Sequence, residues 1–114
     1  MCRVSLSADS RPHEAIAFQV LATWFKRLKG LLGTSEDADP VALVRCGSIH
    51  TFAMSYPIDI AFVDERGWII GAVRSLAPNR VASSPGAFIT LERPAGEGPW
   101  FEEGERVSMC CVAG

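Results

Sequence analysis

The chain has 114 residues, of which 48% are hydrophobic, a composition that supports one well-filled core and argues against intrinsic disorder. Its 11 basic and 13 acidic residues give a formal net charge of −2, which provides no electrostatic basis for binding nucleic acid. We therefore expect a single domain over residues 1–114 that has no nucleic-acid partner.

The amino-terminal segment and the cysteines bear on the cellular compartment. The first 17 residues, MCRVSLSADSRPHEAIA, lack the apolar core of a secretory signal, and no stretch has the length of a transmembrane span. The four cysteines, Cys2, Cys46, Cys110 and Cys111, do not have the spacing of a disulfide framework. We expect reduced thiols, a cytoplasmic location and no membrane partner.

The first half of the chain is predicted to hold two strands and one helix. Residues 1–12 read as a loosely ordered lead-in, ahead of a core over residues 13–112. Residues 15–22 (AIAFQVLA) are apolar enough for a buried strand. A threonine suited to cap a helix is followed by apolar residues at helical spacing, which predicts a short helix over residues 23–32. A short β-branched run at residues 41–45 is typical of a strand.

The second half is predicted to consist of strands and turns. Residues 58–63 and 68–73 flank the sequence DERG at 64–67, which has the acid-first, glycine-last chemistry of a tight hairpin. Residues 76–86 contain two prolines and two serines and read as a long surface loop. Two further strands are expected, at residues 88–92 and 106–112. Six or seven short strands with one short helix predict a mainly β fold, a compact antiparallel barrel or sandwich.

Polar side chains interrupt an otherwise apolar stretch at residues 48–64 (SIHTFAMSYPIDIAFVD). If residues 58–63 form a strand, Asp59 is the lone carboxylate in a segment that is apolar on both sides. A buried polar group must be hydrogen-bonded, since burial without a partner costs several kcal/mol. Asp59 is therefore either a structural acid paired with an arginine or with backbone donors, or a carboxylate that lines a pocket.

His50 permits several interpretations. It would lie close to Asp59 if the intervening chain turned back on itself. Cys46, His50 and Met54 have the spacing of a blue-copper ligand loop, but such a site needs a second histidine and zinc needs a further Cys/His pair. The other histidine, His13, lies in the lead-in. We expect no metal and no cofactor, and we interpret His50 instead as a hydrogen-bonded, partly buried histidine.

The remaining candidates lie around this stretch. Met54 is either core filling or part of a ligand surface. Glu92 ends a predicted strand just before Pro94, where the default interpretation is an acceptor that stabilises the turn. Arg80, in the long loop, is a natural partner for Asp59 or Glu92. The candidate ligand-binding residues are thus His50, Thr51, Met54, Tyr56, Asp59, Arg80 and Glu92.

Known catalytic templates do not fit the sequence. It contains neither a G-x-S-x-G elbow nor a glycine-rich phosphate loop. A nucleophile pair of Cys46 and His50 is conceivable, but four residues of extended strand span roughly 13 Å, which is too far for a hydrogen bond.

Several motifs, in order, resemble a family of uncharacterised bacterial and archaeal proteins, the domain of unknown function 192. They are LKGLLG at residues 28–33, SIHTFAM at 48–54 and PIDIAFVD at 57–64, followed by the later landmarks Gly67, Pro78, Leu91-Glu92, Ala95-Gly96 and Gly104. Thr34 departs from the arginine common in the family, and we do not expect here the export signal that many relatives carry. The resemblance implies a small, mostly β fold and no established activity, cofactor or substrate.

The hypothesis from the sequence is a small binding module. A groove near His50, Met54, Tyr56 and Asp59, closed by the 76–86 loop, would hold a small polar ligand or a peptide. One alternative is a hydrolase-like enzyme in which His50 and Asp59 act as a general acid–base pair. The other is a protein-interaction module that uses an exposed sheet edge or the aromatic residues Trp24 and Trp100.

Overall fold

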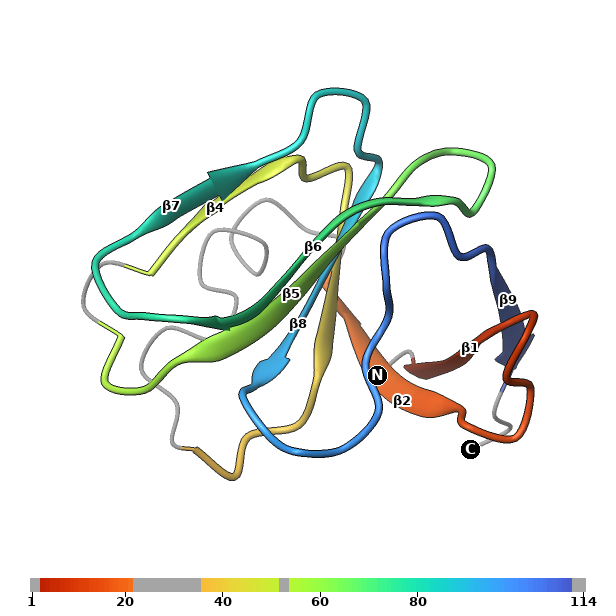
Figure 1. Cartoon of the computed structure of the whole chain (residues 1–114), viewed down its shortest axis with the longest axis horizontal. Helices are drawn as coiled ribbons and strands as arrows, with labels where there is room; N and C mark the ends of the chain where they lie inside the picture. The colour runs from red at the N-terminus through yellow and green to blue at the C-terminus, as the bar shows by residue number, and fades with distance from the viewer. Residues whose placement is uncertain (1–2, 22–35, 52–53, 112–114) are drawn as a thin grey trace.

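The computed structural model describes residues 3–21, 36–51 and 54–111, and shows a mainly β protein (Figure 1). The strands within these residues are β1 (Arg3–Ala8), β2 (Ile16–Leu21), β3 (Val41–Val44), β4 (Ser48–His50), β5 (Ile58–Val63), β6 (Ile69–Leu76), β7 (Val81–Ser83), β8 (Ile89–Pro94) and β9 (Val107–Cys111). None of these residues is helical. The helix predicted over residues 23–32 lies outside the described residues.

Seven strands form one curled, half-barrel sheet, in the order β6-β5-β8-β3-β2-β1-β9. Neighbours in this sheet are antiparallel except β2 and β3, which run parallel. The expected mainly β character is therefore confirmed. The main sheet is, however, a curled half-barrel with one parallel strand pair rather than an antiparallel barrel or sandwich. The strands β4 and β7 form a separate two-stranded sheet, on the opposite side of the β5–β8 pair from β1, β2 and β9 (Figure 1).

The segment predicted as a loosely ordered lead-in contains strand β1. This strand is hydrogen-bonded on both sides, to β2 and to β9. Its sequence alternates apolar residues with serine, and Leu6 and Ala8 are buried while Ser5 and Ser7 are less so. The sequence prediction was wrong here. The alternation of apolar residues and serine covers only five residues, VSLSA, and a segment at the end of a chain is usually expected to be poorly ordered.

The segment predicted as a long surface loop, residues 76–86, contains strand β7. This short strand pairs antiparallel with β4, and Ala82 lies opposite Ile49. Both residues pack against the large sheet, whereas the flanking residues of each strand are exposed. Two strands of three residues are too short to be stable alone, so packing rather than strand propensity holds them in place, and composition did not reveal them.

The predicted strand and hairpin around residues 58–67 are confirmed. Strand β5 has the expected bounds, and all six of its residues are buried. In the turn, the N–H of Asp64 donates to the carbonyl of Trp68 (3.0 Å), and the Asp64 carboxylate accepts the N–H groups of Arg66 and Trp68. Gly67 adopts φ 91°, a conformation that glycine takes without steric cost.

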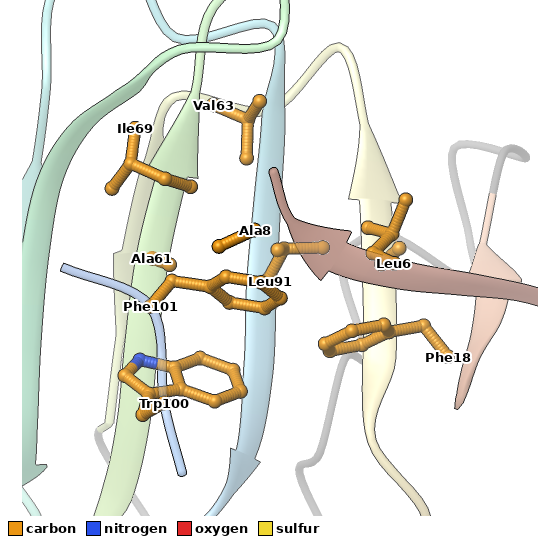
Figure 2. Close-up of a cluster of buried hydrophobic side chains, with 10 residues drawn as sticks. Leu6, Ala8, Phe18, Ala61, Val63, Ile69, Leu91, Trp100 and Phe101 are labelled. Atoms are coloured by element: carbon orange, nitrogen blue, oxygen red, sulfur yellow. The ribbon is translucent and has the colours of Figure 1, made fainter. Parts of the chain in front are cut away.

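The two faces of β5 contribute to two different apolar clusters. Ala61 and Val63 belong to the first cluster, which Figure 2 shows around the rings of Phe18, Trp100 and Phe101. Ile58, Ile60 and Phe62 belong to the second cluster, against which the small sheet packs. The other buried members of the second cluster are Leu21, Val41, Leu43, Met54 and Tyr56. The β5–β8 pair thus separates two cores, and a polar side chain on these strands faces one of them.

Candidate functional site

Asp59 lies on the face of β5 that carries the first cluster, and it is fully buried. Its Oδ2 accepts a hydrogen bond from Nε of Arg93 (2.9 Å), the residue directly opposite on β8. Its Oδ1 accepts the N–H of Ser75 (2.9 Å), and the N–H of Gly96 is 3.4 Å from Oδ2. Because both oxygens are occupied within the protein, this geometry favours the structural interpretation of Asp59.

Arg93 extends this network to the loop that follows β8. Its Nη1 donates to the carbonyl of Pro99 (2.7 Å) and its Nη2 to that of Gly98 (2.8 Å), while its guanidinium lies 4.6 Å from the ring centroid of Trp100. Arg74 adds a longer ion pair to Asp59, at 3.6 Å. The arginine partners of Asp59 are therefore Arg93 and Arg74, and the predicted partner Arg80 is not among them. The network fixes the path of the 94–99 segment across the sheet.

Thr51 and Arg80, two of the predicted candidates, lie together, but through the backbone of Arg80. The Thr51 hydroxyl accepts the N–H of Arg80 (2.8 Å) and donates to the carbonyl of Ala77 (2.7 Å). The N–H of Thr51 donates in turn to the carbonyl of Arg80 (2.8 Å). Thr51 is fully buried and Arg80 is exposed, so this pair anchors the turn before β7 to the end of β4.

His50 is exposed on β4, opposite Val81 of β7, so the prediction of a partly buried histidine was wrong. Its neighbour Ile49 packs toward the second cluster, so His50 points away from that cluster, as expected for the next residue of a strand. Asp59 faces the first cluster, on the other side of β5. The structure thus does not bring His50 and Asp59 together as a pair.

Met54 and Tyr56 are buried members of the second cluster, with 9% and 2% of their surface exposed. Both lie in the segment that leads from the small sheet to β5. This placement favours the core-filling interpretation of Met54. The second cluster to which both side chains belong is also the one that Glu92 faces.

Glu92 lies on β8 and faces the second cluster. Val41 of β3 and Ile60 of β5 are directly opposite it on the two neighbouring strands, and both belong to that cluster. Only 5% of Glu92 is exposed, and none of the described residues forms a hydrogen bond or ion pair with its carboxylate. Burial raises the pKa of the Glu92 carboxyl from 4.5 to about 7.

The sequence interpretation of Glu92 as a turn acceptor was therefore wrong. The acceptor that serves the turn after β8 is Asp59, through the N–H of Gly96. Thr90, the next residue of β8 on the same face as Glu92, already donates to the carbonyl of Cys46 (2.6 Å). Glu92 thus differs from the other buried polar side chains, Thr51, Asp59 and Thr90, each of which has partners within the protein.

Within the described ranges, no three His, Cys, Asp or Glu side chains are grouped so as to hold a metal ion. The Sγ of Cys46 lies 3.2 Å from the carbonyl of Ser48. No helix that is long and apolar enough to cross a membrane is found in the part of the chain that the structure describes.

Comparison with known proteins identifies the family of this chain. The model of the family described as "Uncharacterized ACR", the domain of unknown function 192, matches residues 4–108. The chain belongs to this family. None of the curated proteins compared with it matches.

Two solved structures share the fold of this domain of unknown function 192. A protein of unknown function from Novosphingobium aromaticivorans superposes with a TM-score of 0.73 at 17% identity, over 93% of this chain and 83% of that one. A candidate transcription regulator from Sinorhizobium meliloti superposes with a TM-score of 0.75 at 18% identity, over 95% of this chain and 92% of that one. At such low identity, these similarities establish the fold alone.

In this member of the family, the sequence alone does not reveal the two arginines that bind Asp59. Arg93 directly follows Glu92, but its place opposite Asp59 depends on the register of two strands that are 26 residues apart along the chain. Once β8 is recognised as a strand, period-two alternation places Glu92 and Arg93 on opposite faces of it. Only one of the two side chains can then lie on the same face as Asp59. Alternation alone does not say which face meets which cluster.

Proposed function

We propose that this protein is a small binding module and that Glu92 is the residue that contacts its ligand. The observation that carries this proposal is a buried carboxyl group with no hydrogen-bonding partner among the described residues. Such a group costs free energy in the unliganded protein, and native proteins retain few of them. A ligand that donates hydrogen bonds to Glu92 would offset this cost, and perturbed carboxyl groups of this kind concentrate at functional sites.

The surroundings of Glu92 have the usual composition of a ligand site. Val41 and Ile60 flank the carboxyl group, and Met54 and Tyr56 belong to the same cluster. Binding sites are generally lined by apolar and aromatic side chains with a small number of polar groups that orient the ligand. The groove expected around His50 and Asp59 is replaced in this proposal by the opposite face of β5, since Asp59 is occupied by Arg93 and His50 points outward.

Binding to nucleic acid is not favoured as a second function, although one relative of the same fold is described as a candidate transcription regulator. The net charge of this chain is −2. Several arginines are already neutralised by acids within the protein, through the pairs Arg3–Asp39, Arg11–Glu105 and Arg93–Asp59. These pairings leave less positive surface for a phosphate backbone.

The other two alternatives also receive less support. An acid–base pair requires contact between His50 and Asp59, which lie on opposite sides of β5. An interaction surface built on Trp100 requires an exposed ring, whereas Trp100 is 3% exposed and donates to the carbonyl of Ile60. Trp24 lies outside the described residues.

The proposal is tested by screening a fragment library against the whole protein by ¹H–¹⁵N NMR. We expect fragments that shift the amide signals of residues 41, 60 and 92 together, and we expect Glu92→Gln to abolish those shifts. Glu103→Gln, which changes an exposed glutamate in the same way, serves as the matched control and should bind as the wild type does. Fragments that bind only elsewhere, or that bind equally well to the Glu92 variant, would overturn the proposal.

A further inference from the structure

We infer that the ligand of the Glu92 site is a primary amine carried on an apolar body. This inference rests on the proposed function and adds the chemical class of the ligand to it. Three features of the described structure support it: the acceptor capacity of the carboxylate, the apolar character of the surrounding face and the small exposed fraction of Glu92.

The carboxylate determines what the head group of the ligand must offer. An ionised carboxylate only accepts hydrogen bonds, and it has about four lone-pair sites on its two oxygens. No described residue fills any of them. A primary ammonium group supplies three donors and one positive charge, so it satisfies both oxygens and compensates the buried charge. A carbonyl ligand would accept only the single proton of the neutral acid and would leave the other oxygen without a partner.

The face around Glu92 determines the rest of the ligand. Its neighbours across the sheet, Val41 and Ile60, are aliphatic, and Thr90 is already bonded to the carbonyl of Cys46. None of these three neighbours is an acid that could hold another cationic group. A polar body would lose its hydration there without gaining a partner, whereas an alkyl or aryl body gains from burial.

The exposed fraction limits the size of the head group. Because only 5% of Glu92 is exposed, the side chains around it must move to admit a ligand, and a small head group requires the least movement. A guanidinium is larger and has five N–H donors, which one carboxylate cannot all satisfy. A quaternary ammonium has no N–H donor. The primary amine is the cationic group that fits both requirements.

The test compares three probes of equal chain length: hexylamine, 1-hexanol and hexanoate. Each is titrated at pH 8 into the whole protein, and the amide signals of residues 41, 60 and 92 are followed by ¹H–¹⁵N NMR. We expect hexylamine to shift these signals at the lowest concentration. Glu92→Gln should weaken hexylamine binding at least about tenfold, which corresponds to about 1.4 kcal/mol, and should weaken 1-hexanol binding by a smaller factor, because the alcohol donates one hydrogen bond and carries no charge. Glu103→Gln should bind all three probes as the wild type does.

The outcomes separate this inference from the proposed function. If 1-hexanol or hexanoate binds more tightly than hexylamine and depends on Glu92, the ligand class is wrong and the proposed function stands. The ligand class is also wrong, and the proposed function again stands, if none of the three probes binds but library fragments without a primary amine shift the signals of residues 41, 60 and 92. If neither probes nor fragments bind there, both proposals fail. Dispersed amide spectra of the Glu92 variant establish that it is folded in each case.

Discussion

Asp59 and Glu92 are both buried carboxylates on neighbouring strands, but their surroundings differ. Asp59 faces the first cluster, where Arg93 and two backbone N–H groups bind it. Glu92 faces the second cluster, where none of the described groups does. A satisfied carboxylate fixes the structure around it, whereas an unsatisfied one lowers the stability of the folded protein. One face of this strand pair therefore holds a structural ion pair, and the other holds the candidate site.

The raised pKa of Glu92 predicts how its charge affects stability. Since burial raises this pKa from 4.5 to about 7, the folded protein holds the proton more tightly than the unfolded chain. The contribution of Glu92 is thus most favourable below pH 4.5, and it is lost as the pH rises to about 7, at a cost of roughly 3 kcal/mol. We expect Glu92→Gln to unfold at a urea concentration close to that of the wild type at pH 5, and to be more stable than the wild type by about 1–3 kcal/mol at pH 8.

The difference between variant and wild type isolates Glu92, because all other titrating groups are common to both. Glu103→Gln provides the exposed control and should show no such change with pH. A difference in unfolding free energy that stays constant from pH 5 to pH 8 would mean that Glu92 is not desolvated in the folded protein.

At the scale of the residue, the sequence identified the important side chains but not all of their roles. Asp59 was recognised because it is the lone acid in an apolar strand, and its structural interpretation was among the alternatives. Glu92 was a candidate, but its neighbour Pro94 suggested a turn acceptor. Its burial without a partner among the described residues depends on which face of β8 meets the second cluster, and that follows from long-range strand pairing, which local composition does not encode.

At the scale of the element, strands with long apolar runs were predicted well. The bounds of β5 are as predicted, because its six residues are apolar apart from Asp59. Strand β7 was not predicted, because its three residues lie between prolines and serines and are held by the contact of Ala82 with the second cluster. Strand propensity is informative where the residues of the strand themselves favour β structure. It fails where contacts with other elements hold the strand in place.

The hairpin between β5 and β6 supports a prediction at this scale. Gly67 has φ 91°, and a Cβ atom there would lie 3.1 Å from the carbonyl oxygen of Val107. Gly104 has a similar φ of 93°, but a Cβ atom there would meet nothing within 4 Å. We expect Gly104→Ala to lose about 1–2 kcal/mol from its backbone conformation alone, and Gly67→Ala to lose more, because the carbonyl of Val107 must also shift.

Thermal and urea unfolding of the two glycine variants measure this difference directly. Equal losses would show that the contact with Val107 is relieved without cost. The comparison matters for the fold because the N–H of Val107 donates to the carbonyl of Gly67 (2.9 Å), so the turn contacts the start of β9.

At the scale of the whole molecule, the same contact brings the two edges of the half-barrel together at one end. Trp68 and Arg106 form an isolated antiparallel bridge, and the N–H of Ile69 donates to the carbonyl of Glu105 (2.8 Å). β6 and β9 are the first and last strands of the sheet, so these bonds partly close it. Partial closure protects the strand ends that an open sheet would expose to pairing with other chains.

An ion pair joins this closure to the amino-terminal part of the chain. Nη2 of Arg11 lies 2.7 Å from Oε1 of Glu105, and the same nitrogen donates to the carbonyl of Trp100 (3.0 Å). Arg11 lies between β1 and β2, while Glu105 and Trp100 precede β9. The pair therefore links the connection between β1 and β2 to the segment that closes the sheet.

The pKa of Glu105 gives this link a pH dependence opposite to that of Glu92. Burial alone would raise the pKa of Glu105, but the hydrogen bonds from Arg11 and from the backbone of Glu102, together with the charge of Arg11, outweigh it and lower the pKa. A lowered pKa means that the folded protein favours the ionised form. The stabilisation is therefore present above the ordinary pKa of 4.5 and is lost as the pH falls through the folded value.

We accordingly expect Glu105→Gln to lower the free energy of unfolding by about 1 kcal/mol at pH 7, a modest loss because Arg11 is 30% exposed and solvent screens the pair. The loss should shrink as the pH falls below 4.5, because protonation of the wild-type carboxyl progressively removes the ion pair. Urea unfolding at pH 7 and pH 3 measures it, with Glu103→Gln as the exposed control. A loss that persists unchanged in acid would assign the effect to packing rather than to charge. Since Glu92 acts in the opposite direction, the double variant Glu92→Gln/Glu105→Gln should show a flatter dependence of stability on pH than either single variant.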